Sequence, residues 1–266
     1  MVVPLVLLLT LALIAPIQHP ETLSLLEEPL YAPPVPKADR ARLEGEIAAA
    51  RGDVARDPSS QEAVLRLARA QRDLGRIGDA LETLTRAIEG KADAPALRLE
   101  RARGLIVIRK FELAQRELRK VAETLPEARC DIAFTLYLLA EYKQSHDEYA
   151  ACKEPGMFGY LAAQRSGAAA GPRPAPPADS ERRQPDITLP GTVSSKPKAA
   201  APSIAASYMD AVDRLVADHK PEAKDLLKQI VEKNKKMWME PVYVAAEADY
   251  SRIVKAEPKR KKKKKT

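Results

Sequence analysis

The feature that most constrains this chain is a set of residues that recurs with the same internal spacing. Ala68 lies twelve residues before Ala80, with Leu84 and Ala87 four and seven residues further on. The same spacing returns three times, at Ala102, Ala114, Leu118 and Val121, then at Ala133, Ser145, Tyr149 and Cys152, and after a gap at Ala211, Ala223, Leu227 and Ile230. Two antiparallel helices approach closely only where both present a small side chain, so each copy predicts a helical hairpin. One hairpin cannot bury its apolar face alone, and the copies are expected to stack.

The repeated unit resembles a tetratricopeptide repeat (TPR), and with the apolar leader described below the chain resembles an exported bacterial TPR-containing protein. The three units of the first part span residues 61 to 153, and the fourth, over 203 to 236, is weaker because Arg214 and Lys220 occupy positions that are usually apolar. The residues that match the family's packing positions are Leu67, Ala68, Gly75, Ile77, Ala80, Leu84, Ala87 and Ile88, then Ala102, Leu105, Phe111, Ala114, Leu118 and Pro126, then Ala133, Leu136, Tyr142 and Tyr149. The resemblance implies an all-α, TPR-like helical hairpin solenoid. The alternative is an irregular helical bundle with an alanine-rich core.

Composition shifts divide the chain into six segments. We expect a signal peptide or N-terminal anchor over 1–19, a Pro-rich spacer over 20–37 and a TPR-like helical domain over 38–165. A disordered Pro/Ala-rich linker over 166–202, a smaller TPR-like helical segment over 203–257 and a Lys-rich tail over 258–266 follow. The spacer and linker are assigned from their prolines, which remove backbone donors and disfavour helix in the preceding residue.

The N-terminal segment from Val2 to Ile17 is uncharged and nearly all apolar, with Pro4, Thr10 and Pro16 as interruptions. It is short for a membrane span but suits the apolar core of a secretory signal. No basic residue precedes it, so an uncleaved anchor stays open as the alternative. We therefore expect an exported protein, periplasmic or secreted.

The formal net charge of +7 lies in the tail rather than in the helical body. Seven basic residues and no acid stand at Lys259, Arg260, Lys261, Lys262, Lys263, Lys264 and Lys265, which leaves 37 basic against 37 acidic side chains elsewhere. Such a tail favours an anionic membrane or a cell-envelope polymer. It has no aromatic residue for base stacking, which argues against specific nucleic-acid binding.

The sequence carries no pattern typical of an enzyme. His19, His146 and His219 belong to no metal-ligand spacing, and no phosphate-binding glycine loop or nucleophile elbow is present. We expect no catalytic residue, no metal and no cofactor. The two cysteines are different, because Cys130 falls early in the first helix and Cys152 late in the second helix of the third unit. Antiparallel packing brings these ends together and predicts a disulfide, while two buried free thiols remain the alternative.

The resemblance also implies a binding surface. In TPR proteins the first helix of each hairpin lines a concave groove that holds a partner peptide or helix. Carried over by position, that groove consists of Leu65, Arg69, Arg72, Leu99, Arg103, Ile106, Phe134, Tyr137 and Leu138. We therefore expect a non-enzymatic scaffold for another protein. The alternative is an envelope-associated structural tether that uses the tail and the Pro-rich linker to hold an anionic surface.

Overall fold

The computed structural model describes residues 19–90, 94–177 and 203–257 of the chain, and within them it is all-α, as the sequence predicts. The elements in chain order are β1 (Thr22–Leu23), β2 (Pro29–Leu30), α1 (Lys37–Arg56), α2 (Gln61–Asp73), α3 (Ile77–Glu89), α4 (Pro95–Val107), α5 (Phe111–Val121), α6 (Ala128–Leu138), α7 (Tyr142–Ala150), α8 (Gly156–Ser166), α9 (Ile204–Val216), α10 (Lys220–Lys233), a 3₁₀ turn (Lys235–Met237) and α11 (Pro241–Ala256). Residues 1–18 of the predicted leader and the whole predicted tail lie outside the described residues. Among the described residues, no helix combines the length and the apolar character needed to cross a membrane.

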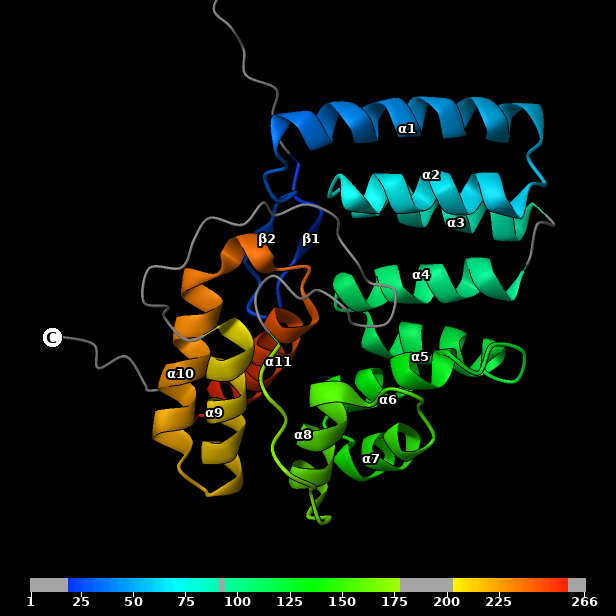
Figure 1. Ribbon diagram of the computed structural model, residues 1–266. Helices are drawn as coiled ribbons and strands as arrows, with labels where there is room; N and C mark the ends of the chain where they lie inside the picture. Colours follow the sequence, from blue (N-terminus) through cyan, green and yellow to red (C-terminus); the bar gives the residue numbers. More distant parts are fainter. Residues whose placement is uncertain (1–18, 91–93, 178–202, 258–266) are drawn as a thin grey trace, which may run out of the picture.

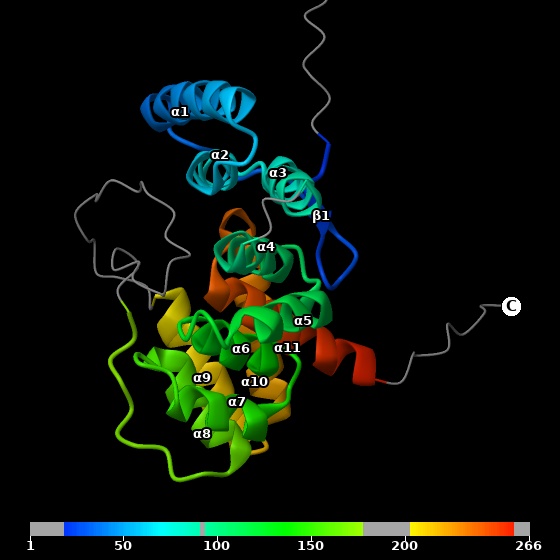
Figure 2. The same cartoon turned by 90° about the vertical axis from the view of Figure 1, so that its right-hand side faces the viewer.

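Consecutive helices pack against one another along the whole chain, and α1 to α8 form one continuous stack (Figure 1). Helices α9, α10 and α11 do not extend this stack. They lie beside it, with α11 packed on α6 and α9 packed on α8. Residues from α4 to α8 and from α9 to α11 share one apolar core, so the two parts form a single folded body (Figure 2).

The recurring small residues are the helix contacts of four hairpins, α2/α3, α4/α5, α6/α7 and α9/α10. The paired positions are Ala68 and Ala80, Ala102 and Ala114, Ala133 and Ser145, and Ala211 and Ala223, and none is more than 6% exposed. The serine of the third hairpin fits because its hydroxyl donates a hydrogen bond of 2.8 Å to the carbonyl of Ala133.

The four hairpins also share one turn. A residue with left-handed backbone follows the first small residue by seven positions each time, at Gly75, Arg109, Ala140 and Asp218, with φ between 59° and 82°. The next N–H donates to the carbonyl five residues back in every case, over 2.8 to 2.9 Å, which is the longer bond of the Schellman motif. Glycine is needed only at the first turn, where a Cβ on residue 75 would lie 2.8 Å from Pro33 Cδ.

The predicted spacer contains a small antiparallel hairpin, with Thr22 opposite Leu30 and Leu23 opposite Pro29. It packs between the N-terminal helices and α11, and we call residues 21–31 the strap. Its contacts are specific: the Glu21 carboxylate accepts from Gly78 N at the start of α3 over 3.0 Å, and Tyr31 O accepts from Trp238 Nε1 over 2.7 Å. The segment is therefore more than an extended connection.

The predicted linker is likewise partly folded. α8 ends at Ser166, and residues 167–177 then run along α9, where Arg173 forms ion pairs with Asp210 and Asp213. Within the predicted linker, residues 167–177 therefore contact α9 through these two exposed ion pairs. Residues 178–202 lie outside the described part.

The left-handed turns provide a test of the hairpin geometry. We expect Ala140→Gly to raise the free energy of unfolding by about 0.5–1 kcal/mol, because glycine relieves the left-handed strain of a residue with a Cβ. Ala151→Gly is the matched control, since Ala151 follows α7 in right-handed conformation and is exposed. This control should lose about 0.5–1 kcal/mol. Urea unfolding of both variants distinguishes them, and an equal loss in both would show that the turn at residue 140 is not left-handed.

Candidate functional site

The first helices of the hairpins, α2, α4 and α6, are joined by ion pairs at equivalent positions. Arg69 and Arg103 each directly follow the first small residue of their hairpin, Ala68 or Ala102. Each pairs with an acid that stands two residues before the first small residue of the next hairpin, Glu100 or Asp131. Arg69 Nε lies 3.4 Å from Glu100 Oε2, and Arg103 Nε and Nη2 both lie 3.1 Å from Asp131 Oδ2. Arg72 also bonds Glu100, and both side chains are buried. These contacts form an ion-pair ladder along the inner helices.

One carboxylate of α2, that of Asp73, has only a shared cation beside it in this ladder. Asp73 is 15% exposed, and its nearest cation, Arg72, is 3.4 Å away and shared with Glu100. Burial raises the pKa of Asp73 to about 6, and the nearby charges of Glu100 and Glu46 act in the same direction against the lowering effect of Arg72. The ionised form of Asp73 therefore costs stability at neutral pH.

The prediction of an accessible groove is wrong at its aromatic end, on α6. Phe134, Tyr137 and Leu138 on α6 are 6%, 0% and 1% exposed. The rings of Phe134 and Tyr137 pack in tilted and edge-on orientations against Phe158 of α8, with centroids 4.6 and 5.4 Å away. Arg252 of α11 donates to the carbonyl of Leu138 over 2.7 Å. The chain's own helices α8, α9 and α11 cover this end.

A buried polar network centred on Asp249 of α11 lies at the same junction. Asp249 is 2% exposed and accepts from Tyr208 over 2.8 Å, Arg165 over 2.9 Å and Arg252 over 2.6 Å. The Tyr137 and Tyr208 hydroxyl oxygens lie 3.0 Å apart, and because Tyr208 gives its one proton to Asp249, Tyr137 is the donor in this second bond. Burial opposes the charge on Asp249, but Arg165 and Arg252 outweigh it and lower its pKa. The network is a paired, hydrogen-bonded interior site.

A second carboxylate of α11 binds the strap. Glu247 is fully buried, and it accepts from the backbone N–H of Leu25 and from Arg109 of the α4/α5 turn. The Arg109 guanidinium also lies 5.5 Å from the centroid of the Trp238 ring. Sequence reasoning missed both carboxylates. The sequence feature that could have identified them is the position of Glu247 and Asp249 among the apolar residues of α11, where an unpaired charge would be costly.

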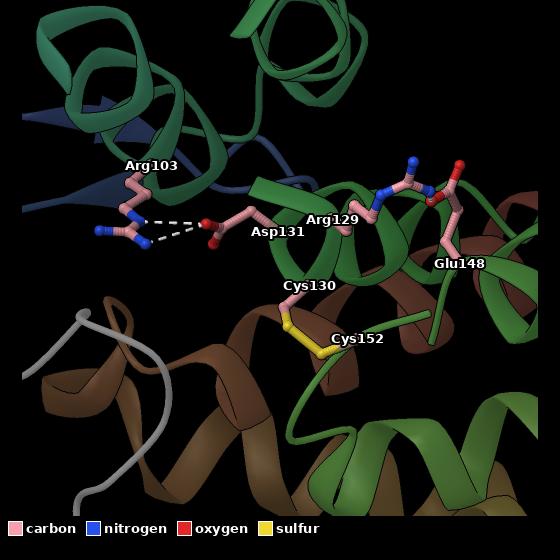
Figure 3. The surroundings of a disulfide bond; sticks show 6 residues. All are labelled: Arg103, Arg129, Cys130, Asp131, Glu148 and Cys152. Atoms are coloured by element: carbon pink, nitrogen blue, oxygen red, sulfur yellow. Dashed lines mark hydrogen bonds and ion pairs between the residues drawn. A yellow bond between two sulfur atoms is a disulfide. The ribbon is translucent and has the colours of Figure 1, made fainter. Parts of the chain in front are cut away.

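Cys130 and Cys152 form a disulfide whose Cα atoms are 5.2 Å apart (Figure 3). The bond joins the first turn of α6 to the residues just after α7, at the far end of the hairpin from the left-handed turn. Arg103 and Asp131 of the ladder lie on one side of it, and Arg129 pairs with Glu148 across the same two helices over 3.4 Å. The ends of the α6/α7 hairpin are therefore closed covalently.

Of the nine predicted groove residues, the structure leaves two accessible. Leu65 is half-buried and the Arg69 side chain is 49% exposed, both on α2. The other seven, Arg72, Leu99, Arg103, Ile106, Phe134, Tyr137 and Leu138, are buried. The accessible part of the predicted groove is therefore confined to α2.

The ionisable groups of the Asp249 network are poorly suited to proton transfer at neutral pH. Burial raises the pKa of Tyr142 to about 12 and the pKa of Tyr208 well above its usual value. Within the described ranges, no three His, Cys, Asp or Glu side chains gather in a way that could hold a metal ion. The Asp249 network thus serves the packing of α6, α8, α9 and α11.

Comparison with family models, with curated proteins and with solved structures finds no match to this chain. A proposal of function must therefore be based on the fold itself and on its repeated turns.

The buried Asp73 predicts a pH-dependent stability. Its folded-state pKa lies above the unfolded value of 3.8, so its ionisation penalises the folded state above pH 6 and the penalty disappears as the pH falls below 4. We expect Asp73→Asn to gain roughly 1–2 kcal/mol at pH 8 and nothing at pH 4. Urea titrations at both pH values measure this, with the exposed Asp147→Asn as a control that should change by less than about 0.5 kcal/mol. A loss of stability in Asp73→Asn at pH 8 would contradict the assignment.

The disulfide closes a loop with a sequence separation of 22 residues. Replacing both cysteines by serine should therefore lower the free energy of unfolding by about 3 kcal/mol in the chain-entropy model. Thiol titration of the denatured protein from its native source is the direct check, and it should find no free thiol. Two free thiols would show that the disulfide is absent and contradict the prediction.

Proposed function

We propose that this protein is a TPR-like, non-enzymatic scaffold that binds another protein, and that it is exported. The observation that carries the proposal is the recurrence of one hairpin geometry four times, with the left-handed residue and the buried small residues at matching positions. Stacked hairpins of this kind place their first helices side by side, and the accessible part of that face in this chain, on α2, is suited to an extended or helical partner segment.

The binding surface that we propose is the accessible face of α2 around Leu65 and Arg69. Arg66 lies one residue beyond Leu65, its side chain is 55% exposed, and it pairs with Asp53 of α1 over 2.6 Å. The face thus combines a half-buried leucine with two accessible arginines. A partner with alternating acidic and apolar residues is complementary to it, because its carboxylates can meet the arginine guanidinium groups.

The test is crosslinked capture from native envelope extract, with the full chain, a chain ending at Pro258 and the variant Leu65→Glu/Arg69→Glu. The matched control is Leu113→Glu/Arg116→Glu, which changes the same residue types at exposed positions of α5. We expect the same protein to be captured by the full chain, the truncated chain and the control, and its recovery to fall at least tenfold with the α2 variant. Equal recovery with both double variants would exclude α2 as the binding surface.

A second candidate is the envelope tether, in which the basic tail and the Pro-rich linker hold an anionic surface. The distribution of charge favours it, because the seven basic residues of the tail account for the whole formal net charge of +7. In the capture experiment, this function predicts that no specific protein is recovered and that only the full chain partitions with membrane or polymer.

A further inference from the structure

Three contacts hold the strap through its backbone. Glu247 of α11 accepts a hydrogen bond from the N–H of Leu25, and the Ser251 hydroxyl donates to the carbonyl of the same residue over 3.2 Å. The indole N–H of Trp238 donates to the carbonyl of Tyr31 over 2.7 Å. Side chains of the folded body thus bind main-chain atoms of the strap, as in sites that bind an extended peptide.

One strap side chain is anchored in the apolar core. Leu30 is 5% exposed and belongs to a cluster that draws residues from α3, α4, α10, α11 and the segment before α11. The other buried members of this cluster are Ile77, Val107, Val231, Trp238, Met239 and Tyr243. We call these six residues, together with Glu247 and Ser251, the strap site. The strap site combines apolar contacts for one leucine with polar groups for the main chain on either side of it.

The strap buries little of its own surface. Among its residues only Ser24 and Leu30 are buried, whereas Leu23 and Tyr31 are 54% and 44% exposed. Figure 2 shows β1 at the outer edge of the folded body. Few buried apolar contacts are typical of a segment that opens locally. Detachment of the strap therefore requires less free energy than unfolding of the helices on which it lies.

A proline-rich hinge joins the strap to α1. Residues 32–36 form this hinge, and Pro33, Pro34 and Pro36 belong to it. Proline has no backbone N–H and keeps the preceding residue extended, so the hinge can change direction without loss of helix or strand hydrogen bonds. Exchange of an element between identical chains alters only such a hinge, because every other contact is remade in the neighbouring copy.

We propose that the strap of one copy occupies the strap site of a second copy, so that two copies of this protein associate by strap exchange. The fold itself identifies the occupant, because the strap is the segment whose complementarity to the site is observed. An exchanged strap keeps the Leu30 anchor and the hydrogen bonds from Ser251 and Trp238. The inference is independent of the binding face proposed on α2, because Leu65 and Arg69 do not belong to the strap site.

Two complementary variants of the full chain test the exchange. Leu30→Asp removes the anchor of the strap and leaves the strap site empty, whereas Glu247→Gln/Trp238→Phe weakens the site and releases an intact strap. The tagged Leu30→Asp chain is mixed with the untagged site variant at equal concentration, and recovery of the untagged chain is measured. The matched control is tagged Leu113→Asp, which makes the same change at an exposed leucine of α5.

Thermal melting by circular dichroism verifies that each chain is folded. If the first site variant does not fold, Ser251→Ala/Trp238→Phe takes its place, because it retains the buried pair of Arg109 and Glu247. A synthetic peptide of residues 19–32 is added to a parallel mixture as a competitor. This peptide fills the empty strap site of the Leu30→Asp chain and should abolish recovery of the site variant.

We expect the Leu30→Asp chain to recover about tenfold more of the site variant than of the wild-type chain, because burial of a leucine holds the wild-type strap in its own site. The Leu113→Asp control should recover no more of the site variant than the wild-type chain does. Equal recovery in all mixtures, or no recovery from folded chains, would overturn the proposal. If the peptide binds the Leu30→Asp chain but the site variant does not, the site accepts a free segment and exchange between copies is wrong.

Discussion

The fold depends on two carboxylates buried in one helix. Glu247 and Asp249 of α11 are nearly or fully inaccessible, and each binds groups from distant parts of the chain. Glu247 holds the strap and the α4/α5 turn through Leu25 N and Arg109, whereas Asp249 holds α8 and α9 through Arg165 and Tyr208. A buried charge is tolerated only when its partners are in place. These pairs therefore tie α11 to the strap, to the α4/α5 turn and to helices α8 and α9.

This docking closes the edge of the stack at which the left-handed turns lie. Gly75 lies against Pro33, two residues after the strap, Arg109 binds Glu247, and Arg252 binds the carbonyl of Leu138 just before the third turn. In an open solenoid each repeat contacts only its neighbours. Here α11 and the strap connect non-adjacent hairpins, so we expect the second and third hairpins and the C-terminal helices to unfold together.

The local features of the fold could be predicted from the sequence. The spacing of small residues located the helix contacts, and Ser60 and Ser203 cap α2 and α9 through hydrogen bonds to Ala63 N and Ala206 N. The covering of the groove could not be predicted in this way. Helical periodicity shows that Phe134 and Tyr137 lie on an apolar face, but not whether a partner or the same chain buries it. The strap contacts join residues more than 200 positions apart, for which no local pattern exists.

The exposed end of the ion-pair ladder, on α2, bears on the charge of the partner that we propose. In α4 and α6 the position two residues before the first alanine is acidic, at Glu100 and Asp131, and it neutralises an arginine of the preceding hairpin. In α2 the same position is Arg66, which turns to Asp53 of α1 instead. The ladder therefore ends with Arg66 and Arg69 both about half exposed and no further hairpin to meet them. Both arginines keep accessible guanidinium edges beside their pairs with Asp53 and Glu100, which is why we propose an acidic-apolar partner segment rather than a basic or purely apolar one.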